Sequence, residues 1–401
     1  MNRGLIFLLL SCNICFSQSE KDSADNTTPY QVFYANRLST HPFGILTLRT
    51  NHNFQTGPAK KISLAINISS GNVWLPYVKA YQPLREDDRN AMRSLLWHQR
   101  DAHFDQSASS SESFEFHADG VMRFYQAALN IPLAEKHELN VNTRMFSLDE
   151  GRVPVSLLTS DRIIEWFHSN VHGGEDPFAR KVYGLEKAMI HYVDENGKTL
   201  EMQKEGLTFS GIDVSYSYYP DFVVLRERGV YTNFGFLLGG NLHQSNPSID
   251  FGFSSSLVKK INFRNRHELH LGGGISALHL NLLNNRNALQ FSNKKLLLSS
   301  EFLLSYIIPN KRNGYFSIAT TYFIQSSYNQ KKNFETIVLT GERYSSHWHY
   351  SISHLYRPLT ANYLIITWAT KVFACSIFLR EDLLVDNAPD AQVGIGIRVS
   401  F

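Results

Sequence analysis

The sequence predicts an all-β fold: a transmembrane antiparallel β-barrel of the outer-membrane type, with about 12 strands (10–14) and one amphipathic helix in a long loop. Three observations predict it. An export signal occupies the N-terminus, residues 60–401 repeatedly carry an apolar side chain at every second position, and the chain ends on the aromatic residue Phe401. Lipid-facing strands need this alternation because one face meets hydrocarbon and the other meets a polar lumen.

The composition agrees with that class and excludes others. Of the 401 residues, 43% are hydrophobic and 19% are charged. This mixture is too apolar for a disordered chain and too polar for a helical membrane protein. The net charge of +3 gives no reason to expect a nucleic-acid partner. Because the sequence contains no nucleotide, zinc or EF-hand motif, we predict no cofactor.

Residues 1–17 are predicted to be a signal peptide. Arg3 supplies the positive charge, Gly4–Leu10 forms the apolar core, and small residues precede a cleavage site that would leave Gln18 first in the mature chain. A lipoprotein signal with Cys12 lipidated and a short buried helix remain alternatives. No later run of about 18 apolar residues is available for a membrane-spanning helix. We therefore expect an exported protein in the outer membrane.

Residues 18–59 are predicted to form an N-terminal segment that precedes the barrel. Residues 18 to about 30 are polar and indicate a flexible leader. Stretches 33–40 and 44–54 leave three interpretations open: a periplasmic segment, a plug in the lumen, or two further strands.

Residues 60–401 are predicted to form the barrel, and the last strand shows the pattern best. Apolar residues at 393, 395, 397, 399 and 401 alternate with polar or small residues. A strand of a soluble sandwich can alternate in the same way, so recurrence is the stronger indication. The alternation recurs at 62–69, 139–145, 212–218, 249–257 and, less sharply, 316–324.

The connectors between the predicted strands fall into two length classes. Short turns are predicted at Pro132–Lys136, Asn262–Arg266, Pro309–Gly314 and Pro358–Asn362. Long loops are predicted at Pro76–Glu112, Asp149–Glu186, Asn241–Pro247, Asn281–Lys294 and Asn329–Ser346. Outer-membrane barrels have short periplasmic turns and longer extracellular loops.

One long loop is predicted to contain a helix of about three turns that begins after Ser160. Ser160 can cap this helix, Ile163, Ile164 and Phe167 follow at helical spacing, and Gly173–Gly174 ends it. We expect the helix to fold into the lumen or to lie over the mouth of the barrel.

This helix and the C-terminal region resemble the family of outer-membrane barrels called domain of unknown function 3187. The resemblance rests on Asp161, Ile164, Phe167 and His168, followed by Gly173, Gly174 and Arg180, and on 378–390 before the last strand. The chain departs from the family pattern at Leu157–Thr159, where glycines are expected, and in the length of loop 76–112. The resemblance implies an outer-membrane barrel and no particular activity.

Asp161, Glu165 and His168 share one face of the predicted helix. Such residues could bind a metal ion or act as acid and base. The simpler interpretation is structural, with the carboxylates anchored to arginines of the lumen, for which Arg144 and Arg180 are candidates. The sixteen histidines include no metal-binding motif, so no metal site is predicted.

The leading functional hypothesis is a passive channel or small-solute transporter. Two alternatives remain: an outer-membrane hydrolase, for which Ser351, Ser353, His349 and His354 supply the residue types, and a structural barrel without transport. The predicted partners are outer-membrane lipid and the barrel-assembly machinery, which would read the C-terminal strand ending in Phe401.

Overall fold

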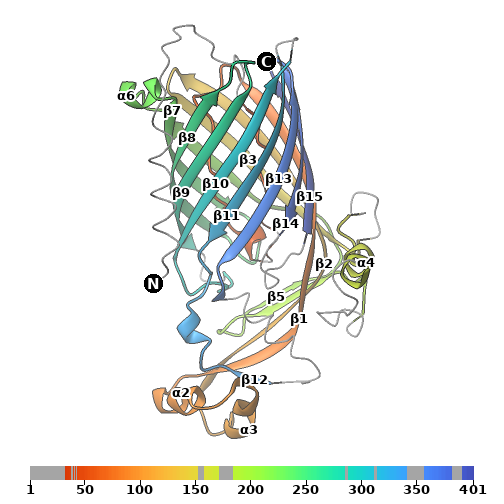
Figure 1. Cartoon of the computed structure of the whole chain (residues 1–401). Helices are drawn as coiled ribbons and strands as arrows, with labels where there is room; N and C mark the ends of the chain where they lie inside the picture. Colours follow the sequence, from red (N-terminus) through yellow and green to blue (C-terminus); the bar gives the residue numbers. More distant parts are fainter. Residues whose placement is uncertain are drawn as a thin grey trace.

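The computed structural model describes residues 32–37, 39, 41, 43–151, 158–170, 184–284, 288–310, 314–340, 356–381 and 391–401. The predicted signal peptide, including Cys12, lies outside these residues. Twelve antiparallel strands close into a barrel (Figure 1). The predicted fold class is therefore confirmed.

The barrel strands follow one another around the wall in chain order. They are β1 (Ser63–Pro83), β2 (Ser111–Ala134), β3 (His137–Asp149), β6 (Glu205–Tyr218), β7 (Val230–Asn241), β8 (Ser248–Asn262), β9 (Glu268–Asn284), β10 (Leu296–Pro309), β11 (Tyr315–Gln325), β13 (Leu359–Ala369), β14 (Phe373–Glu381) and β15 (Ala391–Ser400). The barrel closes because β15 pairs with β1, from Ser400 opposite Ser63 to Gln392 opposite Gly71. Closure pairs the backbone groups that an open sheet edge would leave unpaired in lipid.

The wall shows the predicted alternation because its two faces meet different surroundings. In β11, Phe316 and Ile318 are exposed on the outside, whereas Ser317 and Thr321 are buried toward the lumen. The same outward belt runs around the barrel. Its large exposed side chains include Ile66, Ile212, Leu238, Phe253, Leu271, Leu304, Leu364, Ile377 and Ile397. An apolar outer belt on a closed barrel is the arrangement that a bilayer requires.

The two ends of the barrel differ in their connections. One end carries the start of β1, the end of β15 and most of the short turns, and the other end carries the long loops. Because long loops are typical of the outside of such barrels, we call the second end the extracellular end. Two predicted boundaries are wrong. Pro358–Asn362 is not a turn, because β13 begins at Leu359 and the turn follows it. Loop 76–112 is shorter than predicted, because both flanking strands continue beyond the wall.

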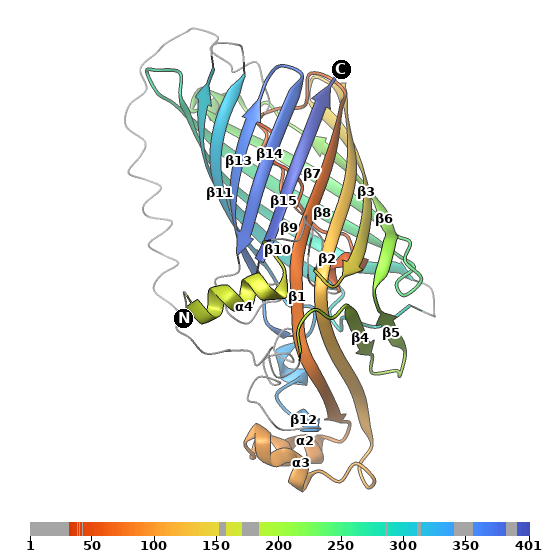
Figure 2. The ribbon, with the colours of Figure 1, turned by 90° about the vertical axis from the view of Figure 1, so that its right-hand side faces the viewer.

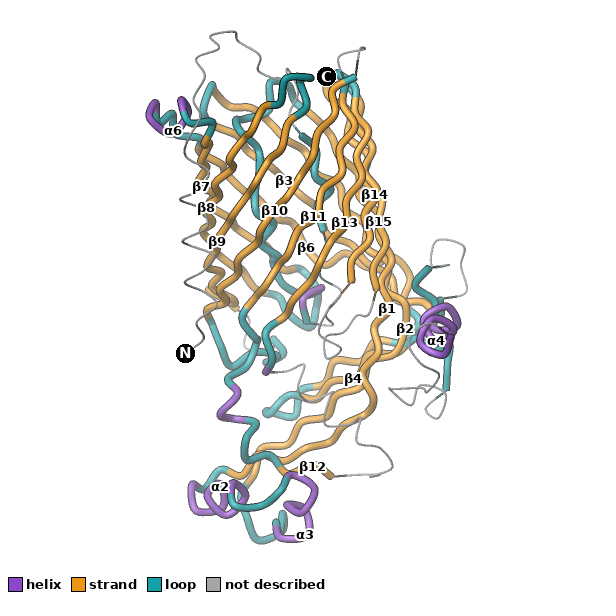
Figure 3. The backbone as a smooth tube through the Cα atoms, viewed as in Figure 1, coloured by secondary structure: helices purple, strands orange, loops and turns teal. Residues whose placement is uncertain are grey.

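These extensions of β1 and β2 build a folded lobe beyond the extracellular end (Figures 1 and 3). Strand β12 (Val338–Thr340) pairs with the edge of β1, and β4 (Met189–Val193) pairs with the edge of β2 and with β5 (Thr199–Met202). Helices α2 (Glu86–Arg93) and α3 (Arg100–His103), joined by the 3-10 turn η2 (Trp97–Gln99), lie at the tip. We call the unit formed by these elements the lobe.

The remaining helices are short. The helix α4 (Asp161–Asn170) lies in the loop after β3, as predicted, and α6 (Val223–Glu227) lies in the turn after β6. The 3-10 turns η1 (Gly44–Leu46) and η4 (Lys331–Asn333) complete the set among the described residues. No helix within the described ranges is long and apolar enough to cross a membrane.

Candidate functional site

The lumen of the barrel contains the segment before β1, and we call residues 32–59, where described, the lumenal segment. Its side chains and backbone contact inward-facing residues on strands all around the wall. Phe33 N donates to Tyr315 Oη at 2.7 Å near the periplasmic end, and Ala59 N donates to Glu138 Oε2 at 2.6 Å. Between them the chain runs to the extracellular mouth and returns, with η1 at the tip. Its described residues contain no strand, so the interpretation of this region as two further barrel strands is wrong.

A charge cluster fixes the middle of the lumenal segment. Glu301 of β10 is buried, and its carboxylate lies 2.5 Å from Arg37 Nη2 and 3.3 Å from His52 Nδ1. Arg37 also donates to Thr321 Oγ1 at 2.7 Å, and Arg49 donates to Tyr363 Oη at 2.8 Å. Buried charges are stable only when paired and hydrogen-bonded, and these contacts meet that need.

Two wall side chains and one from the loop between β7 and β8 bind consecutive backbone groups at the tip. Asn246 Nδ2 donates to the carbonyl of Leu46 at 2.7 Å, and Arg144 Nη1 donates to the carbonyl of Thr47 at 2.8 Å. The amide of Leu48 donates to Asp250 Oδ2 at 2.9 Å. These contacts give hydrogen-bond partners to buried backbone N–H and C=O groups that have none from regular secondary structure.

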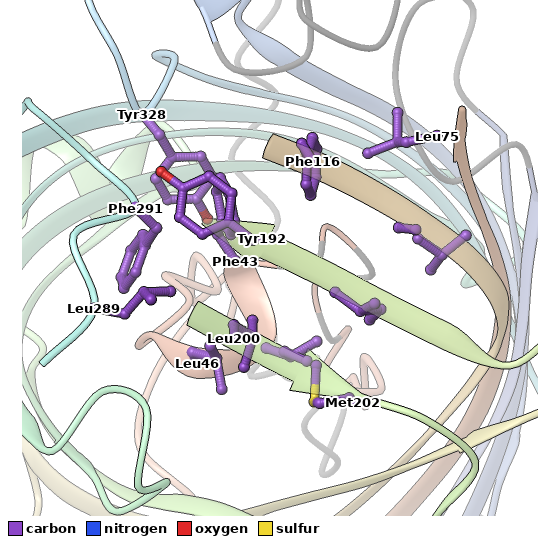
Figure 4. Packing of buried hydrophobic residues seen from close by; sticks show 14 of the residues in the cluster. Phe43, Leu46, Leu75, Phe116, Tyr192, Leu200, Met202, Leu289, Phe291 and Tyr328 are labelled. Carbon is purple, nitrogen blue, oxygen red and sulfur yellow. The ribbon is translucent and has the colours of Figure 1, made fainter. Parts of the chain in front are cut away.

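An apolar cluster lies at the extracellular mouth, and we call it the mouth cluster. Phe43 and Leu46 of the tip are fully buried in it. The Phe43 ring centroid lies 4.7–6.1 Å from those of Phe116, Tyr192, Phe291 and Tyr328 (Figure 4). Phe116 and Tyr192 belong to lobe strands β2 and β4, so the lobe and the lumenal segment share one core.

The lumen retains a cavity of about 130 Å³. Polar side chains line much of it, including Asn36, Asn142 and Ser215. Its size is sufficient for several water molecules. The remaining space is therefore a pocket beside the lumenal segment.

Arg144 does not pair with the helix carboxylates, contrary to the predicted anchoring. Its guanidinium lies inside the barrel, 2.8 Å from Asp213 Oδ2, and its Nη2 donates to Asn241 Oδ1 at 2.7 Å. Arg180 and the side chain of His168 lie outside the described part of the chain. Of the predicted site residues, only Asp161 and Glu165 are seen together.

The helix α4 lies outside the barrel, with its beginning beside the outer face of β1 (Figures 1 and 2), so the expectation of a helix in the lumen or over the mouth is wrong. Asp161 Oδ1 accepts from Asn72 Nδ2 at 2.7 Å, and Ser70 Oγ lies 2.7 Å from Thr159 Oγ1. Glu165 is buried next to this anchor. The shared face of Asp161 and Glu165 was predicted correctly, but the wall surface that it meets was not.

No group of three or more histidine, cysteine, aspartate or glutamate residues within the described ranges could hold a metal ion. The residues on which the hydrolase alternative rests, namely His349, Ser351, Ser353 and His354, lie outside those ranges. Sequence reasoning missed the inward-facing acids Asp213, Asp250 and Glu301. An acidic side chain that faces the lumen of a narrow barrel needs a hydrogen-bond or ionic partner. These acids, at lumen-facing positions of the alternating pattern, could therefore have indicated that something binds them inside the barrel.

The sequence matches no family model and no curated protein. Solved structures with similar folds include an outer-membrane channel from Pseudomonas putida F1, with 8% identity, a TM-score of 0.39 and coverage of 88% of this chain and 100% of that one. LpxR from Salmonella typhimurium has 8% identity and a TM-score of 0.36, covering 84% and 100%. The β domain of the Bordetella autotransporter BrkA has 7% identity and a TM-score of 0.35, covering 84% and 99%. None of these likenesses bears on function, which must be argued from this chain's own residues.

Proposed function

We propose that this protein is an outer-membrane barrel that is closed in its resting state and serves as a scaffold for the extracellular lobe. The mouth cluster carries the proposal because it joins the tip of the lumenal segment and the base of the lobe in one apolar core. A barrel built in this way positions the lobe rigidly at the cell surface. This function corresponds to the structural alternative rather than to a passive channel.

The energetics of the mouth cluster support a closed lumen. Opening a path would expose the buried apolar side chains of Phe43, Ile45, Leu46 and Leu48. Each costs about 1.5–3 kcal/mol when transferred to water, so the tip resists displacement by roughly 6–12 kcal/mol. That range matches the whole stability of a typical domain, about 5–15 kcal/mol. Spontaneous opening would then be rare.

Conductance in planar bilayers tests the closed lumen. We expect no ion current from the wild-type protein and current steps from Phe43→Asp, because a charge cannot stay in the mouth cluster without a partner. The matched control Phe43→Leu keeps the position apolar and should stay closed. A steady current from the wild-type protein would contradict the proposal.

Labelling of intact cells tests the orientation. Ser107 lies in the exposed tip of the lobe, and Glu135 lies in the exposed turn at the other end of the barrel. With Cys375 replaced by serine, a membrane-impermeant maleimide should label Ser107→Cys and leave Glu135→Cys unlabelled. The reverse pattern would mean that the lobe faces the periplasm.

A gated small-solute transporter is the second candidate. The polar cavity beside the lumenal segment favours it, because water can replace the hydrogen bonds that hold this part of the segment. Under this alternative the segment would leave the lumen in response to a partner. Current from wild-type protein only after a periplasmic extract is added would favour it over the closed scaffold.

Assembly through the C-terminal strand remains part of the proposal. The backbone amide of Phe401 donates to Ile62 O at 2.9 Å, and the ring is exposed. The terminal residue therefore lies at the seam between the first and last strands, where an assembly factor could reach it. Removal of Phe401 should lower the amount of folded barrel in the membrane, and unchanged insertion would count against this role.

A further inference from the structure

Two pairs of residues on α4 are reversed relative to a helix in water, although Ile164 is buried and Arg162 is exposed, as they would be there. Asp161 and Glu165 are 2% and 4% exposed, whereas Trp166 and Phe167 are 60% and 44% exposed. A helix on a water-soluble surface buries its apolar stripe and exposes its charged face. Burying two carboxylates while exposing two large aromatic rings is unfavourable in water. The reversal indicates that the outer face of α4 meets a surrounding other than water.

The wall beneath α4 departs from the pattern of the lipid-facing belt. The first outward-facing side chains of this region are apolar and exposed, namely Ile62, Leu64 and Ile66. Further along the same face of β1, the polar residues Ser70 and Asn72 are almost completely buried. Thr159 and Asp161 cover these two residues. The Thr159 carbonyl and Asp161 Oδ1 accept hydrogen bonds from Asn72 Nδ2, and the hydroxyls of Ser70 and Thr159 form a hydrogen bond with each other. Polar groups on a lipid-facing surface are costly without such partners.

The neighbouring strands carry an ion pair at the same level of the outer wall. Arg123 of β2, which is opposite Ser70, lies 2.9 Å from Asp149 of β3, and both side chains are largely buried. Gly151 packs beside Val121, which lies directly opposite Asp149 in the pairing of β2 with β3. Gly151, Thr159 and Asp161 therefore cover a polar patch of the barrel exterior.

The height of this patch places α4 at the edge of the hydrocarbon. A tilted membrane-spanning strand needs about 9–11 residues, so a span that begins at Ile62 ends near Ser70–Asn72. Figure 2 shows α4 lying across the barrel axis at this level. Its long direction is thus close to the plane of the bilayer, and it lies on the extracellular side. Aromatic residues such as tryptophan prefer this boundary region.

We propose that α4 is an interfacial helix that binds outer-leaflet lipid through the face of Trp166 and Phe167, while its carboxylate face covers the polar patch on β1. The occupant of the exposed face is lipid at the boundary between headgroups and acyl chains, because that face continues the apolar belt of the barrel. The proposal requires that the barrel spans a bilayer with the lobe on the outside, as proposed above. It does not depend on whether the lumen conducts or on what the lobe does.

Quenching of tryptophan fluorescence by brominated lipid tests the proposal. The full-length protein is reconstituted into phosphatidylcholine vesicles with bromine at carbons 6 and 7 of one acyl chain, or without bromine. The signal of Trp166 is the difference between the wild-type protein and Trp166→Phe. We expect brominated lipid to remove most of this difference. Trp97 lies in the lobe, so the difference between the wild-type protein and Trp97→Phe should be unchanged by bromine.

Three results would overturn the proposal. Equal Trp166 signals in brominated and plain vesicles would show that no lipid reaches the helix. Strong quenching of Trp166 by aqueous iodide would show that the helix faces water. Protection from both quenchers would point to another protein or a second copy as the occupant and would also overturn it. The conservative change Trp166→Phe keeps an aromatic ring, and Phe236→Leu on the belt serves as a control for unaltered folding and insertion.

Discussion

The middle and the tip of the lumenal segment are held by different interactions. In the middle, Arg37 and His52 meet the buried carboxylate of Glu301 through directional, charged contacts. At the tip, Phe43 and Leu46 enter an apolar cluster that extends into the lobe. The polar contacts specify where the segment lies, because each needs one geometry. The apolar cluster supplies the resistance to opening, because burial of large side chains scales with area.

This difference predicts that the two regions fail in different ways when they are mutated. A change in the charge cluster should destabilise the protein while the mouth remains closed. A change in the mouth cluster should open the lumen. The following variants test the difference in order of expected effect.

Glu301→Gln should cause the largest loss of stability. Removing one partner of a buried ion pair leaves Arg37 without a compensating charge, which costs about 3–5 kcal/mol. Denaturant unfolding in detergent, followed by tryptophan fluorescence, measures the loss, and the double variant with Arg37→Gln should recover part of it. The purified variant should still carry no current. Current through it would mean that the charge cluster, and not the mouth cluster, keeps the lumen closed.

Asn246→Leu should have a smaller effect. Asn246 is fully buried and is a hydrogen-bond donor to the Leu46 carbonyl at the tip. Loss of a donor to a buried carbonyl costs about 1–3 kcal/mol. The same unfolding experiment measures it, with Asn265→Leu in an exposed turn as the control. An equal effect at the two positions would argue against a specific contact with the tip.

Lys79→Met should cause the smallest loss of stability, and the size of that loss should depend on pH. A hydrogen bond from Lys79 lowers the pKa of Glu115 in the lobe below its ordinary value of 4.5. A lowered folded-state pKa means that this stabilisation is complete above the unfolded pKa and is lost as the pH falls through the folded one. The side chains are 37% and 23% exposed, so the contribution is below about 1 kcal/mol.

Hydrogen exchange of the lobe amides in β1 and β2 measures this small contribution. Exchange, corrected for its intrinsic pH dependence, should accelerate in the wild-type lobe when the pH drops from about 7 to about 3, in the window set by the lowered pKa. The Lys79→Met lobe should change less over the same range. Identical pH responses would mean that the contact with Glu115 does not stabilise the lobe.

The barrel was predictable because its signal is local and periodic. Alternation at 249–257 or 393–401 is imposed by lipid on one side and the lumen on the other, and it is visible residue by residue. The lumenal segment has no such period, because its backbone is satisfied by side chains of the barrel and its loops, such as Asp250 and Asn246, rather than by neighbours in sequence. Its three possible placements could therefore not be separated from sequence.

The helix α4 shows the same limit in a sharper form. Helical spacing predicted its existence and the shared face of Asp161 and Glu165, since both follow from 3.6 residues per turn. The partner of that face could not be predicted, because it is Asn72, a residue distant in sequence on the outside of β1. A polar residue at a lipid-facing position of β1 was the sign that something covers the wall there.

The central claim is that the protein's own N-terminal segment fills the barrel, and a disulfide cross-link tests it most directly. A Cβ built on Gly239 of β7 lies 2.7 Å from the Cβ of Leu48, so a slight separation gives the distance that a disulfide needs, about 3.5–4.5 Å. In a Cys375→Ser background, Leu48→Cys with Gly239→Cys should cross-link in protein isolated from the membrane, as peptide mapping would show. Leu48→Cys with Leu238→Cys, whose second cysteine faces outward on the same strand, should not. Two free, reactive thiols in the first pair would contradict a lumen occupied by this segment.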